Sequence, residues 1–319
     1  MRVAITGSTG LIGTALTRSL LADGHQVLRL TRGRGPSVTT SNTTAATTTA
    51  ITTSAAADGT ESASWDPKAQ TVQPGALEGV DAVVHLAGAG IGDKRWNDAY
   101  KRELRDSRVL GTQTIARAIA ELDVKPRVLV SASATGYYGD TGDRVVEEST
   151  PAGNDFLAGL CVEWEQAAAP AEAAGIRVVH PRTGLVLSAK GGAWGKLFPL
   201  FRYGIGGRLG SGRQYWPFIS LDDHIAALRF AIDNDDVAGP LNFSAPEPLT
   251  NREITKVMGR VMHRPTLAAV PEFALKIVIG EFASGITGSC RAVPAGLLKA
   301  GFAFQHPTFE QSLDSVLGK

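Results

Sequence analysis

The feature of this sequence that most restricts its fold is a glycine-rich turn close to the first residue. Glycines stand at positions 7, 10 and 13 in the segment Gly7-Ser8-Thr9-Gly10-Leu11-Ile12-Gly13. A short apolar run over 3–6 precedes the turn, and apolar residues at helical spacing follow it as far as Gly24. A second apolar run covers 27–31. This order of strand, glycine turn, helix and strand predicts one βαβ unit.

The glycine spacing fits a loop that holds the pyrophosphate of a dinucleotide. Glycine permits the sharp turn at 7, lets the backbone approach a phosphate at 10, and allows close helix–strand packing at 13. The N–H groups of the first helical turn then point at the phosphates. The alternative is a tight turn that binds nothing. We expect dinucleotide contacts from Gly7, Thr9, Gly10, Leu11, Ile12 and Gly13.

The end of the second strand distinguishes between the two nicotinamide dinucleotides. An NAD site usually has an acidic residue there, which binds the ribose 2′-hydroxyl. Here the strand ends Leu30-Thr31-Arg32, and the first acidic residue after it is Asp58. Arg32 can bind a 2′-phosphate with two hydrogen bonds, and Thr31 can donate another. The sequence therefore predicts NADP(H) as cofactor, held by Thr31 and Arg32, and leaves Arg34 open between a phosphate contact and a solvated charge.

Strands alternate with helices over the first part of the chain. Apolar runs at 82–86, 127–131 and 177–180 indicate strands, and helical patterns cover 95–122 and 162–174. This alternation predicts an α/β fold with a Rossmann-type, doubly wound parallel sheet. We expect this domain to span 1–182 and a smaller C-terminal substrate domain to span 183–319, with 217–245 returning to the first. In the second part, helices are expected at 221–232, 250–262 and 309–317, and a strand at 241–244.

The segment 37–64 has a different composition from the rest of the chain. It consists almost entirely of Thr, Ser and Ala. Such a run buries too little apolar surface to offset its ordering entropy, so we expect a low-complexity loop insert. Because threonine favours strands, a short edge hairpin is the alternative.

Charge and cysteine content restrict the class of partner. Net charge is +1, so no broad basic surface suggests a nucleic acid or an anionic membrane. No run reaches the roughly 18 apolar residues of a membrane span, and the N-terminus makes a poor signal peptide. Cys161 and Cys290 belong to no metal-binding pattern. We expect a cytoplasmic protein, monomeric or homodimeric, without a metal site, that acts on a small molecule.

Several further motifs resemble those of one enzyme superfamily. They are His85-Leu86-Ala87-Gly88, Lys94-Arg95-Trp96, Ser131-Ala132-Ser133 before Tyr138-Gly139, Arg182-Thr183-Gly184 and Gly210-Ser211-Gly212-Arg213-Gln214. Together with the glycine turn they resemble the extended short-chain dehydrogenases/reductases, and more narrowly their "epimerase family protein" branch, the SDR39U group. The resemblance implies an NADP(H)-binding fold called oxidoreductase or epimerase, and it names no substrate. Ser220 departs from the pattern, which has a histidine there.

The catalytic pair of the wider superfamily is missing. Its members use a Tyr and a Lys four residues apart, on the helix that here contains Glu165. Counting back from Glu165 places the tyrosine position at Leu157 and the lysine position at Cys161. Neither side chain can exchange the proton that accompanies hydride transfer.

Other polar residues near the expected carboxyl edge of the sheet are candidates for the site. For proton transfer we select Ser133, Tyr137 and Tyr138, although Ser133 could instead form a turn and one tyrosine could be packing. Further cofactor contacts are expected from Leu86, Ala87, Gly88, Ser131 and Arg182. Arg95, Arg108 and Arg213 are candidates for substrate binding, each with a solvated surface charge as the alternative.

Three functions remain open from the sequence. The first is an NADP(H)-dependent oxidoreductase with a non-standard proton donor. The second is an NADP(H)-binding sensor or scaffold that lacks turnover. The third, a sugar-nucleotide epimerase, ranks last because it needs the missing acid/base pair.

Overall fold

The computed structural model describes residues 1–33, 54–55 and 58–318, which divide into two compact units. Unit 1 comprises 1–88, 106–131 and 167–178, and unit 2 comprises 89–105, 132–166 and the chain from 179 onward. The grouping differs from a single division at 182. The physical reason is that apolar side chains of 89–105 and 132–166, such as Trp96 and Leu160, pack with Phe282 of the C-terminal half.

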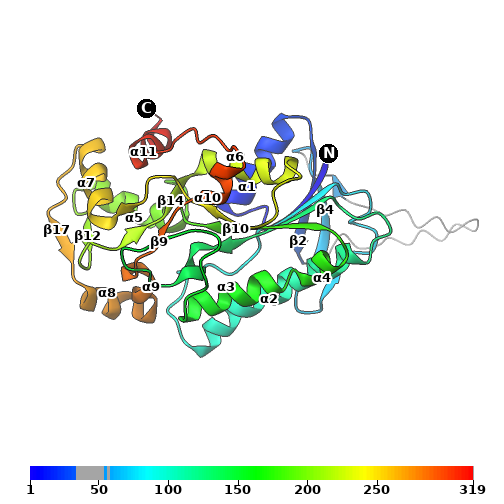
Figure 1. The fold of residues 1–319 in the computed structure, drawn as a ribbon, viewed down its shortest axis with the longest axis horizontal. Coiled ribbons are helices and arrows are strands. Elements are labelled where there is room, and N and C mark those ends of the chain that lie inside the picture. Colours follow the sequence, from blue (N-terminus) through cyan, green and yellow to red (C-terminus); the bar gives the residue numbers. More distant parts are fainter. Residues whose placement is uncertain (34–53, 56–57, 319) are drawn as a thin grey trace, which may run out of the picture. The chain divides into compact units, whose positions relative to one another are not determined.

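Unit 1 contains a largely parallel sheet. Its central strand β1 (Arg2–Thr6) pairs in parallel with β2 (Gln26–Arg32) on one side and β6 (Ala82–His85) on the other. Strand β7 (Val128–Ser131) pairs in parallel with β6. Strand β4 (Glu61–Asp66) pairs in parallel with β2, and both are labelled in Figure 1. Short strands β3 (Ser54–Ala55) and β5 (Thr71–Val72) are antiparallel to β4. The helices are α1 (Leu11–Ala22), most of α2 (Asp98–Ala120) and α4 (Ala169–Ala173).

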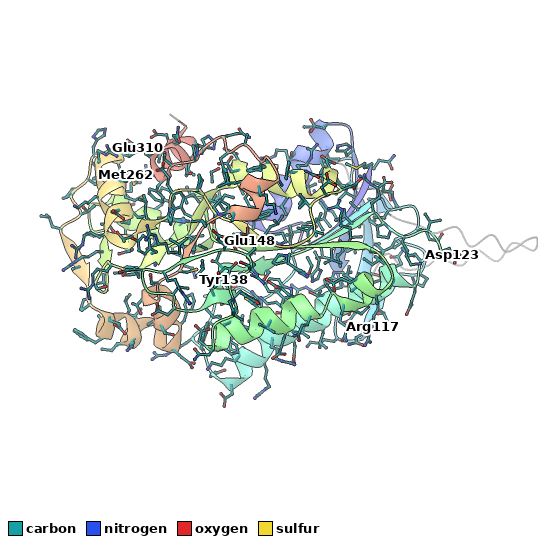
Figure 2. The ribbon with its side chains drawn as sticks, in the orientation of Figure 1. Arg117, Asp123, Tyr138, Glu148, Met262 and Glu310 are labelled. Atoms are coloured by element: carbon teal, nitrogen blue, oxygen red, sulfur yellow. The ribbon has the colours of Figure 1, made fainter. Side chains whose placement is uncertain are left out.

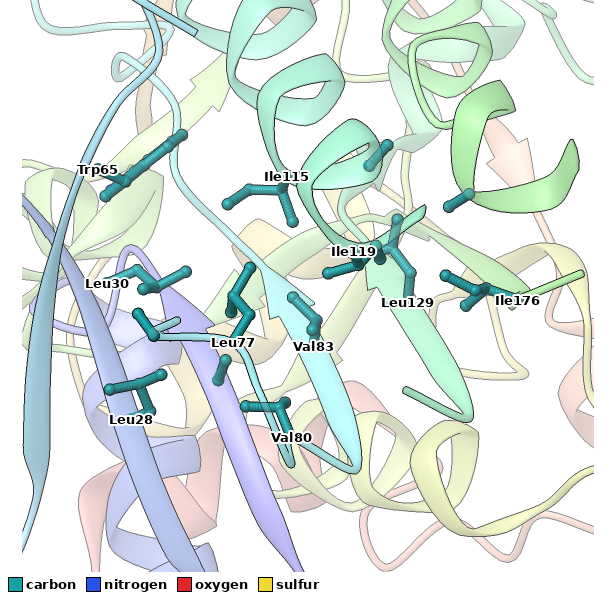
Figure 3. Close-up of a cluster of buried hydrophobic side chains, with 14 of the residues drawn as sticks. Leu28, Leu30, Trp65, Leu77, Val80, Val83, Ile115, Ile119, Leu129 and Ile176 are labelled. Atoms are coloured by element: carbon teal, nitrogen blue, oxygen red, sulfur yellow. The ribbon is translucent and has the colours of Figure 1, made fainter. Parts of the chain in front are cut away.

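The core of unit 1 lies between these strands and helix α2. Ile115 and Ile119 of α2 pack over Val83 and Leu129 of the sheet, and all four side chains are fully buried (Figure 3). Such burial stabilises the fold by about 1.5–3 kcal/mol for each large apolar side chain. This packing holds the carboxyl ends of β1 and β6 in place, and the loops that follow these strands begin there.

Strands β3 and β4 correct the expected loop at 37–64 and agree with its alternative, a short edge hairpin, because β3 pairs antiparallel with β4 at the end of the strand order. Residues 61–64 of β4 belong to that segment, and they pair with β2 in the register Leu28↔Glu61 to Thr31↔Ser64. Ala63 and Trp65 are buried in the core of unit 1. The composition of the segment hid this strand because its residues 61–64, Glu-Ser-Ala-Ser, include only one small apolar residue. The rest of the insert up to residue 53 lies outside the described residues, as does Arg34.

Unit 2 contains the second half of β10 (Arg177–Thr183), a strand that begins in unit 1. There it pairs in parallel with β15 (Gly239–Phe243) and β8 (Ser133–Ala134), so the strand expected at 241–244 does return to the strand at 177–183. The other short strands are β9 (Val145–Val146), β11 (Leu185–Leu187), β12 (Gly207–Leu209), β13 (Tyr215–Trp216), β14 (Phe218–Ser220), β16 (Leu249–Thr250), β17 (Ala268–Val270) and β18 (Arg291–Ala292).

Helices account for most of the remaining residues of unit 2. They are η1 (Thr135–Tyr138), α3 (Phe156–Gln166), α5 (Gly192–Arg202), α6 (Leu221–Asp233), α7 (Asn251–Val261), α8 (Glu272–Ile279), η2 (Gly280–Phe282), α9 (Ala283–Thr287), α10 (Ala295–Lys299) and α11 (Phe309–Leu317). The helix expected at 250–262 is α7, which starts with a capping box of Thr250 and Glu253. The single helix expected at 162–174 is instead α3 and α4, because Pro170 lies in the first turn of α4, where a missing N–H costs least.

Candidate functional site

The glycine turn of unit 1 leaves no room for side chains. Gly7 has φ +68°, and a Cβ there would lie 2.9 Å from the Ala87 nitrogen and the Leu86 carbonyl. A Cβ on Gly13 would lie 2.3 Å from the Gly7 oxygen. Both distances are far below contact, so β1, α1 and the loop after β6 can approach one another only through glycine.

The first turn of α1 presents unused backbone donors. Gly10 is its N-cap residue, in extended conformation (φ −74°, ψ 173°) and without a side chain to cap the helix. The N–H groups of Leu11, Ile12 and Gly13 precede the first intrahelical hydrogen bond. Thr9 and Gly10 are exposed, so the cradle is open to an anion.

The Thr6 hydroxyl orders the loop that follows β6. It accepts hydrogen bonds from the backbone nitrogens of Leu86 and Ala87 (3.1 and 3.2 Å) and directs its proton to Nδ1 of His85 (2.8 Å). Burial lowers the pKa of His85 to about 3, so the ring is neutral. His85 is therefore a hydrogen-bonded strand residue, as its apolar context suggested, and carries no charge toward a ligand.

Two further candidate site residues, Ser131 and Arg108, lie in unit 1 near the loop that follows β6. The Ser131 hydroxyl is buried and has no hydrogen-bond partner among the described residues. A Cβ at exposed Gly88 would lie 3.4 Å from the guanidinium carbon of Arg108. The structure thus places Arg108 beside the loop after β6, in the same unit as the glycine turn. An orphaned hydroxyl and a nearby cation suit a polar, anionic ligand.

Strand β2 has no acidic residue at its carboxyl end. Thr31 and Arg32 are both exposed there. Asp58, the first acidic residue after the strand in sequence, is paired with Arg29 at 2.8 Å and accepts the Thr60 hydroxyl proton at 2.7 Å. Asp66 follows Trp65, the β4 partner of Arg32, and its Oδ1 accepts from the backbone nitrogens of Lys68 and Ala69 at 2.8 and 3.1 Å. The Thr60 hydroxyl, above all, lowers the pKa of Asp58. The exposed groups at this strand end are therefore a hydroxyl and a guanidinium.

Arg182 organises a second, separate group of polar side chains, in unit 2. Its Nε and Nη2 donate to the two carboxylate oxygens of Glu165, each at 2.9 Å. Nη1 donates to the Tyr138 hydroxyl and to the backbone oxygen of Glu148, both at 3.1 Å. Tyr138 and Glu148 are labelled in Figure 2. Burial alone would lower the pKa of Arg182, but the hydrogen bonds and charge of Glu165 raise it above its usual range. All of its nitrogens are used, and only 3% of the residue is exposed, so it cannot hold a nucleotide as we expected.

The two tyrosines of η1 differ in their surroundings. The buried Tyr138 hydroxyl donates to Oδ1 of Asn242 at 2.7 Å, and burial raises its pKa to about 12. The Tyr137 ring packs on Arg182, whose guanidinium carbon lies 3.4 Å from the ring centroid. Tyr137 is only half-buried, and its hydroxyl has no hydrogen-bond partner in the part of the chain that the structure describes. Of the two hydroxyls, only that of Tyr137 has a free proton.

Ser133 is adjacent to Arg182 in the paired strands β8 and β10. Its hydroxyl donates to Oε1 of Glu165 at 2.6 Å, and the residue is buried. The proton that would bind a substrate oxygen is thus directed at a carboxylate. The structure brings Ser133, Tyr137, Tyr138 and Arg182 together as expected, but as members of one internally bonded cluster.

Helix α3 confirms that the usual Tyr/Lys pair is absent from the expected positions. Leu157 lies beside Gly136, where an added Cβ would be 3.5 Å from it. The Cys161 thiol is buried and points to the Ala134 oxygen at 3.8 Å. The sequence of α3, FLAGLCVEWEQ, contains no Tyr, Lys, His, Ser or Thr. This helix therefore offers carboxylates and a thiol, and no hydroxyl or amine.

The three arginines expected at a substrate do not share one place. Arg108 belongs to unit 1, whereas Arg95 and Arg213 belong to unit 2. Arg95 donates to the Ile277 oxygen at 3.1 Å and packs against Gly280. Arg213 is exposed and lines a surface hollow with Tyr215.

Sequence reasoning missed Glu165 and Asn242 as partners of the cluster. Glu165 served only as a reference point for counting, and Asn242 was part of an expected strand. The available signal was a buried-strand arginine, Arg182, which requires an acidic partner. The described residues contain no group of acidic, His and Cys side chains suited to a metal ion. Nor does any helix in them have the length and apolar character to cross a membrane.

Several known proteins resemble this chain in sequence and in fold. A curated epimerase family protein of Mycobacterium bovis is 45% identical over 312 residues, covering 98% of this chain and 96% of the relative. The crystal structure of the human epimerase family protein SDR39U1 with NADPH matches all of both chains, with a TM-score of 0.86 and 31% identity. A nucleoside-diphosphate sugar epimerase of Corynebacterium glutamicum is 33% identical, with a TM-score of 0.76, and 58% of it is covered.

Family models divide the chain into two parts. A domain of unknown function, DUF1731, matches residues 270–316. The NAD dependent epimerase/dehydratase family matches residues 3–243, which include the glycine turn, the Arg182 cluster and β15. This match covers most of the chain, and the chain belongs to the NAD dependent epimerase/dehydratase family.

Proposed function

We propose that this protein is an NADP(H)-dependent oxidoreductase that reduces a carbonyl group with a non-standard proton donor. The observation that carries the proposal is the pairing of an open glycine cradle with the end of β2, which has Arg32 and no acidic residue of its own. The similar human protein was crystallised with NADPH, which supports the same choice of cofactor. Bound NADPH would supply the hydride.

The residues of unit 1 suit each part of this cofactor. The first-turn N–H groups of α1 and Gly10 would hold the pyrophosphate. Thr31 and Arg32 would bind the 2′-phosphate, since a guanidinium forms two parallel hydrogen bonds with a phosphate. Leu86, Ala87, Gly88 and Ser131 would contact the nicotinamide half. Arg182 is excluded from this set because Glu165, Tyr138 and Glu148 occupy its donors.

Calorimetry tests the cofactor choice. We expect NADPH to bind more tightly than NADH, and Arg32→Ala to reduce that preference by about 1–3 kcal/mol, the scale of a charge-assisted hydrogen bond. Arg18→Ala is a matched control, because Arg18 is an exposed arginine of the same unit on α1. Equal affinity of the unmutated protein for both nucleotides would contradict the assignment.

Tyr137 is the best placed proton donor of the three candidates. The Ser133 and Tyr138 protons are held by Glu165 and Asn242, whereas the Tyr137 hydroxyl is unbonded. Arg182 stacks on the Tyr137 ring and fixes its orientation. Tyr137 would give its proton to the substrate oxygen as the carbon is reduced. Tyr138 and Ser133 then position this tyrosine through Arg182 and Glu165.

Turnover measurements test this role. NADPH oxidation over a panel of aldehydes and ketones identifies a usable substrate. With it, Tyr137→Phe should lower kcat by roughly 10²–10⁴ with little change in NADPH affinity, because general acid catalysis contributes on that scale. Ser133→Ala and Tyr138→Phe should have smaller effects. If Tyr137→Phe reduces the substrate at the unmutated rate, the donor is bound water or another residue.

Two other functions have specific support. Helix α3 offers no proton-transferring pair, which favours an NADP(H)-binding sensor or scaffold. The Corynebacterium relative is described as a sugar-nucleotide epimerase, which favours that activity, but an epimerase needs the acid/base pair that α3 lacks. Tight NADPH binding without turnover over the whole panel would favour the sensor.

A further inference from the structure

A polar hollow in unit 2 is separate from both polar groups described above. Its volume is about 330 Å³, within the size range of small-molecule sites. Strands β13 and β16, the start of α7 and the turn at 210–213 form its wall. The lining residues are Asp143, Gly212, Arg213, Tyr215, Thr250, Arg252, Glu253 and Lys256.

Cations outnumber carboxylates in the lining of the hollow by three to two. Arg213, Arg252 and Lys256 all line it, and none of them forms an ion pair within residues 1–33, 54–55 and 58–318. The whole chain has a net charge of only +1, so a basic composition does not explain the cluster. Like charges gathered in excess repel one another, and an anionic ligand relieves that repulsion.

The two carboxylates of the lining offset part of this charge. Hydrogen bonds from Thr250, and then the charges of Lys256 and Arg291, lower the pKa of Glu253, so this carboxylate is ionised. Oε2 of Glu253 accepts from the Thr250 nitrogen (2.8 Å) and hydroxyl (2.7 Å) in the capping box. Asp143 is exposed at the rim. Beside the hollow, the Arg291 guanidinium lies 4.7 Å from the centroid of the Tyr215 ring, which adds a fourth cation next to the aromatic wall.

The backbone holds two of the arginines in fixed positions. The Arg252 nitrogen donates to the Gly212 oxygen at 2.9 Å, and the Arg213 nitrogen donates to Oγ of Ser211 at 3.2 Å. The buried Asn251 side chain accepts from the Leu209 nitrogen at 2.9 Å, which binds the turn to the start of α7. The site is therefore organised before a ligand arrives, which reduces the entropy lost on binding.

We infer that this hollow binds the phosphate or carboxylate group of a small anionic molecule. Guanidinium groups suit either oxyanion, because both accept paired hydrogen bonds. The glycine cradle belongs to unit 1, so this is a second anion site. The inference holds whether the protein is a reductase or a sensor, and in a reductase it gives Arg213 its role in holding the substrate.

Titration calorimetry with two probes, inorganic phosphate and malonate, tests the inference at constant ionic strength. The variants are Arg252→Gln and Lys256→Gln, with Lys299→Gln as control, since Lys299 is an exposed lysine outside the hollow. All variants retain the glycine cradle, so a difference among them reports the hollow alone. Their melting temperatures verify that each is folded.

We expect saturable binding to the unmutated protein. Arg252→Gln and Lys256→Gln should each weaken it about tenfold or more, the usual loss for a charge-assisted hydrogen bond. Lys299→Gln should bind as tightly as the unmutated protein. The probe that binds more tightly identifies the group as phosphate or carboxylate. Absence of saturable binding for both probes overturns the inference. Equal binding by Arg252→Gln and Lys299→Gln overturns it as well, and neither result bears on NADPH binding.

Discussion

The glycine turn of unit 1 and the Arg182 cluster of unit 2 use polar groups in opposite ways. At the turn, the glycines have no side chains, and the backbone N–H groups of Leu11 and Ile12 have no hydrogen-bond partner among the described residues. In the cluster, Arg182 and Glu165 satisfy each other in a buried pair, with every nitrogen of the arginine bonded. Unsatisfied donors at an exposed helix start are available to a ligand, whereas satisfied buried ones stabilise the fold.

This difference indicates separate roles for two arginines, Arg32 and Arg182, that have similar sequence contexts. Arg32 and Arg182 both lie near the end of a predicted strand, and both were expected to contact the cofactor. Arg32 is exposed at the end of β2, while Arg182 is buried among Glu165, Tyr138 and Tyr137. Burial with complete hydrogen bonding indicates a positioning role for Arg182, and exposure leaves Arg32 free to recognise a ligand.

The largest expected effect concerns the buried ion pair. Arg182→Met should lower the free energy of unfolding by about 3–5 kcal/mol, because it leaves the Glu165 carboxylate without its partner. NADPH affinity of the folded variant should change little. Denaturant unfolding measures the first quantity and calorimetry the second.

Arg105→Met is the matched control for this change. Arg105 pairs with Glu163 of α3 at 2.6 Å, but their side chains are 48% and 43% exposed. An exposed pair contributes about 0–1 kcal/mol. If the two variants lost equal amounts of stability, the Arg182 cluster would not be a special contribution to the fold. If Arg182→Met selectively lost NADPH affinity, the cluster would bind the cofactor, which we assign to the turn.

A smaller effect is expected at the glycine turn. Gly13→Ala places a Cβ 2.3 Å from the Gly7 oxygen, which forces β1 and α1 apart. Overpacking of this kind costs about 1–3 kcal/mol of stability, and NADPH binding should weaken because the first-turn N–H groups move. Unfolding and calorimetry of the same preparation separate the two effects.

Gly159→Ala tests whether the Gly13 effect is specific. Gly159 is an exposed glycine within α3, with no atom within 4 Å of an added Cβ outside the backbone of its own helix. Alanine there should stabilise the protein by about 0.5–1 kcal/mol through helix propensity. If Gly13→Ala behaved like Gly159→Ala, the turn would have more room than the structure shows.

Local sequence was sufficient to predict the turn but not the cluster. The glycines, the capping box of Thr250 and Glu253, and the helix at Phe309–Leu317 all follow from residues a few positions apart. The partners of Arg182 lie 17, 34 and 44 positions away, so no local pattern shows which of its hydrogen bonds are used. Strand β4 was missed for a related reason, because only its pairing with β2 buries Ala63.

The smallest expected effect is a loss of stability at acid pH, and we expect it to be of equal size in the two units. His85 of unit 1 and His224 of unit 2 are buried, and burial lowers the pKa of each from 6.5 to about 3. The unfolded chain therefore binds more protons than the folded one between pH 3 and 6.5. Stability is fully present above about pH 6.5 and is lost as pH falls toward 3. At pH 5.5 each histidine should cost about 1.4 kcal/mol relative to pH 7.5.

Urea unfolding at pH 7.5 and 5.5 measures this loss in three variants. Asn at 85 keeps an oxygen that can accept the Thr6 proton, so His85→Asn should reduce the acid-induced loss by about 1.4 kcal/mol. His224→Gln should do the same in unit 2, because its amide can bond to Thr183. His263→Asn is the control, since His263 is exposed and asparagine tolerates its positive φ of 52°. If His85→Asn retained the full pH dependence, a water or ligand at Nε2 would be charging the ring, and unit 1 would then contain a titrating group beside its nucleotide turn that unit 2 lacks.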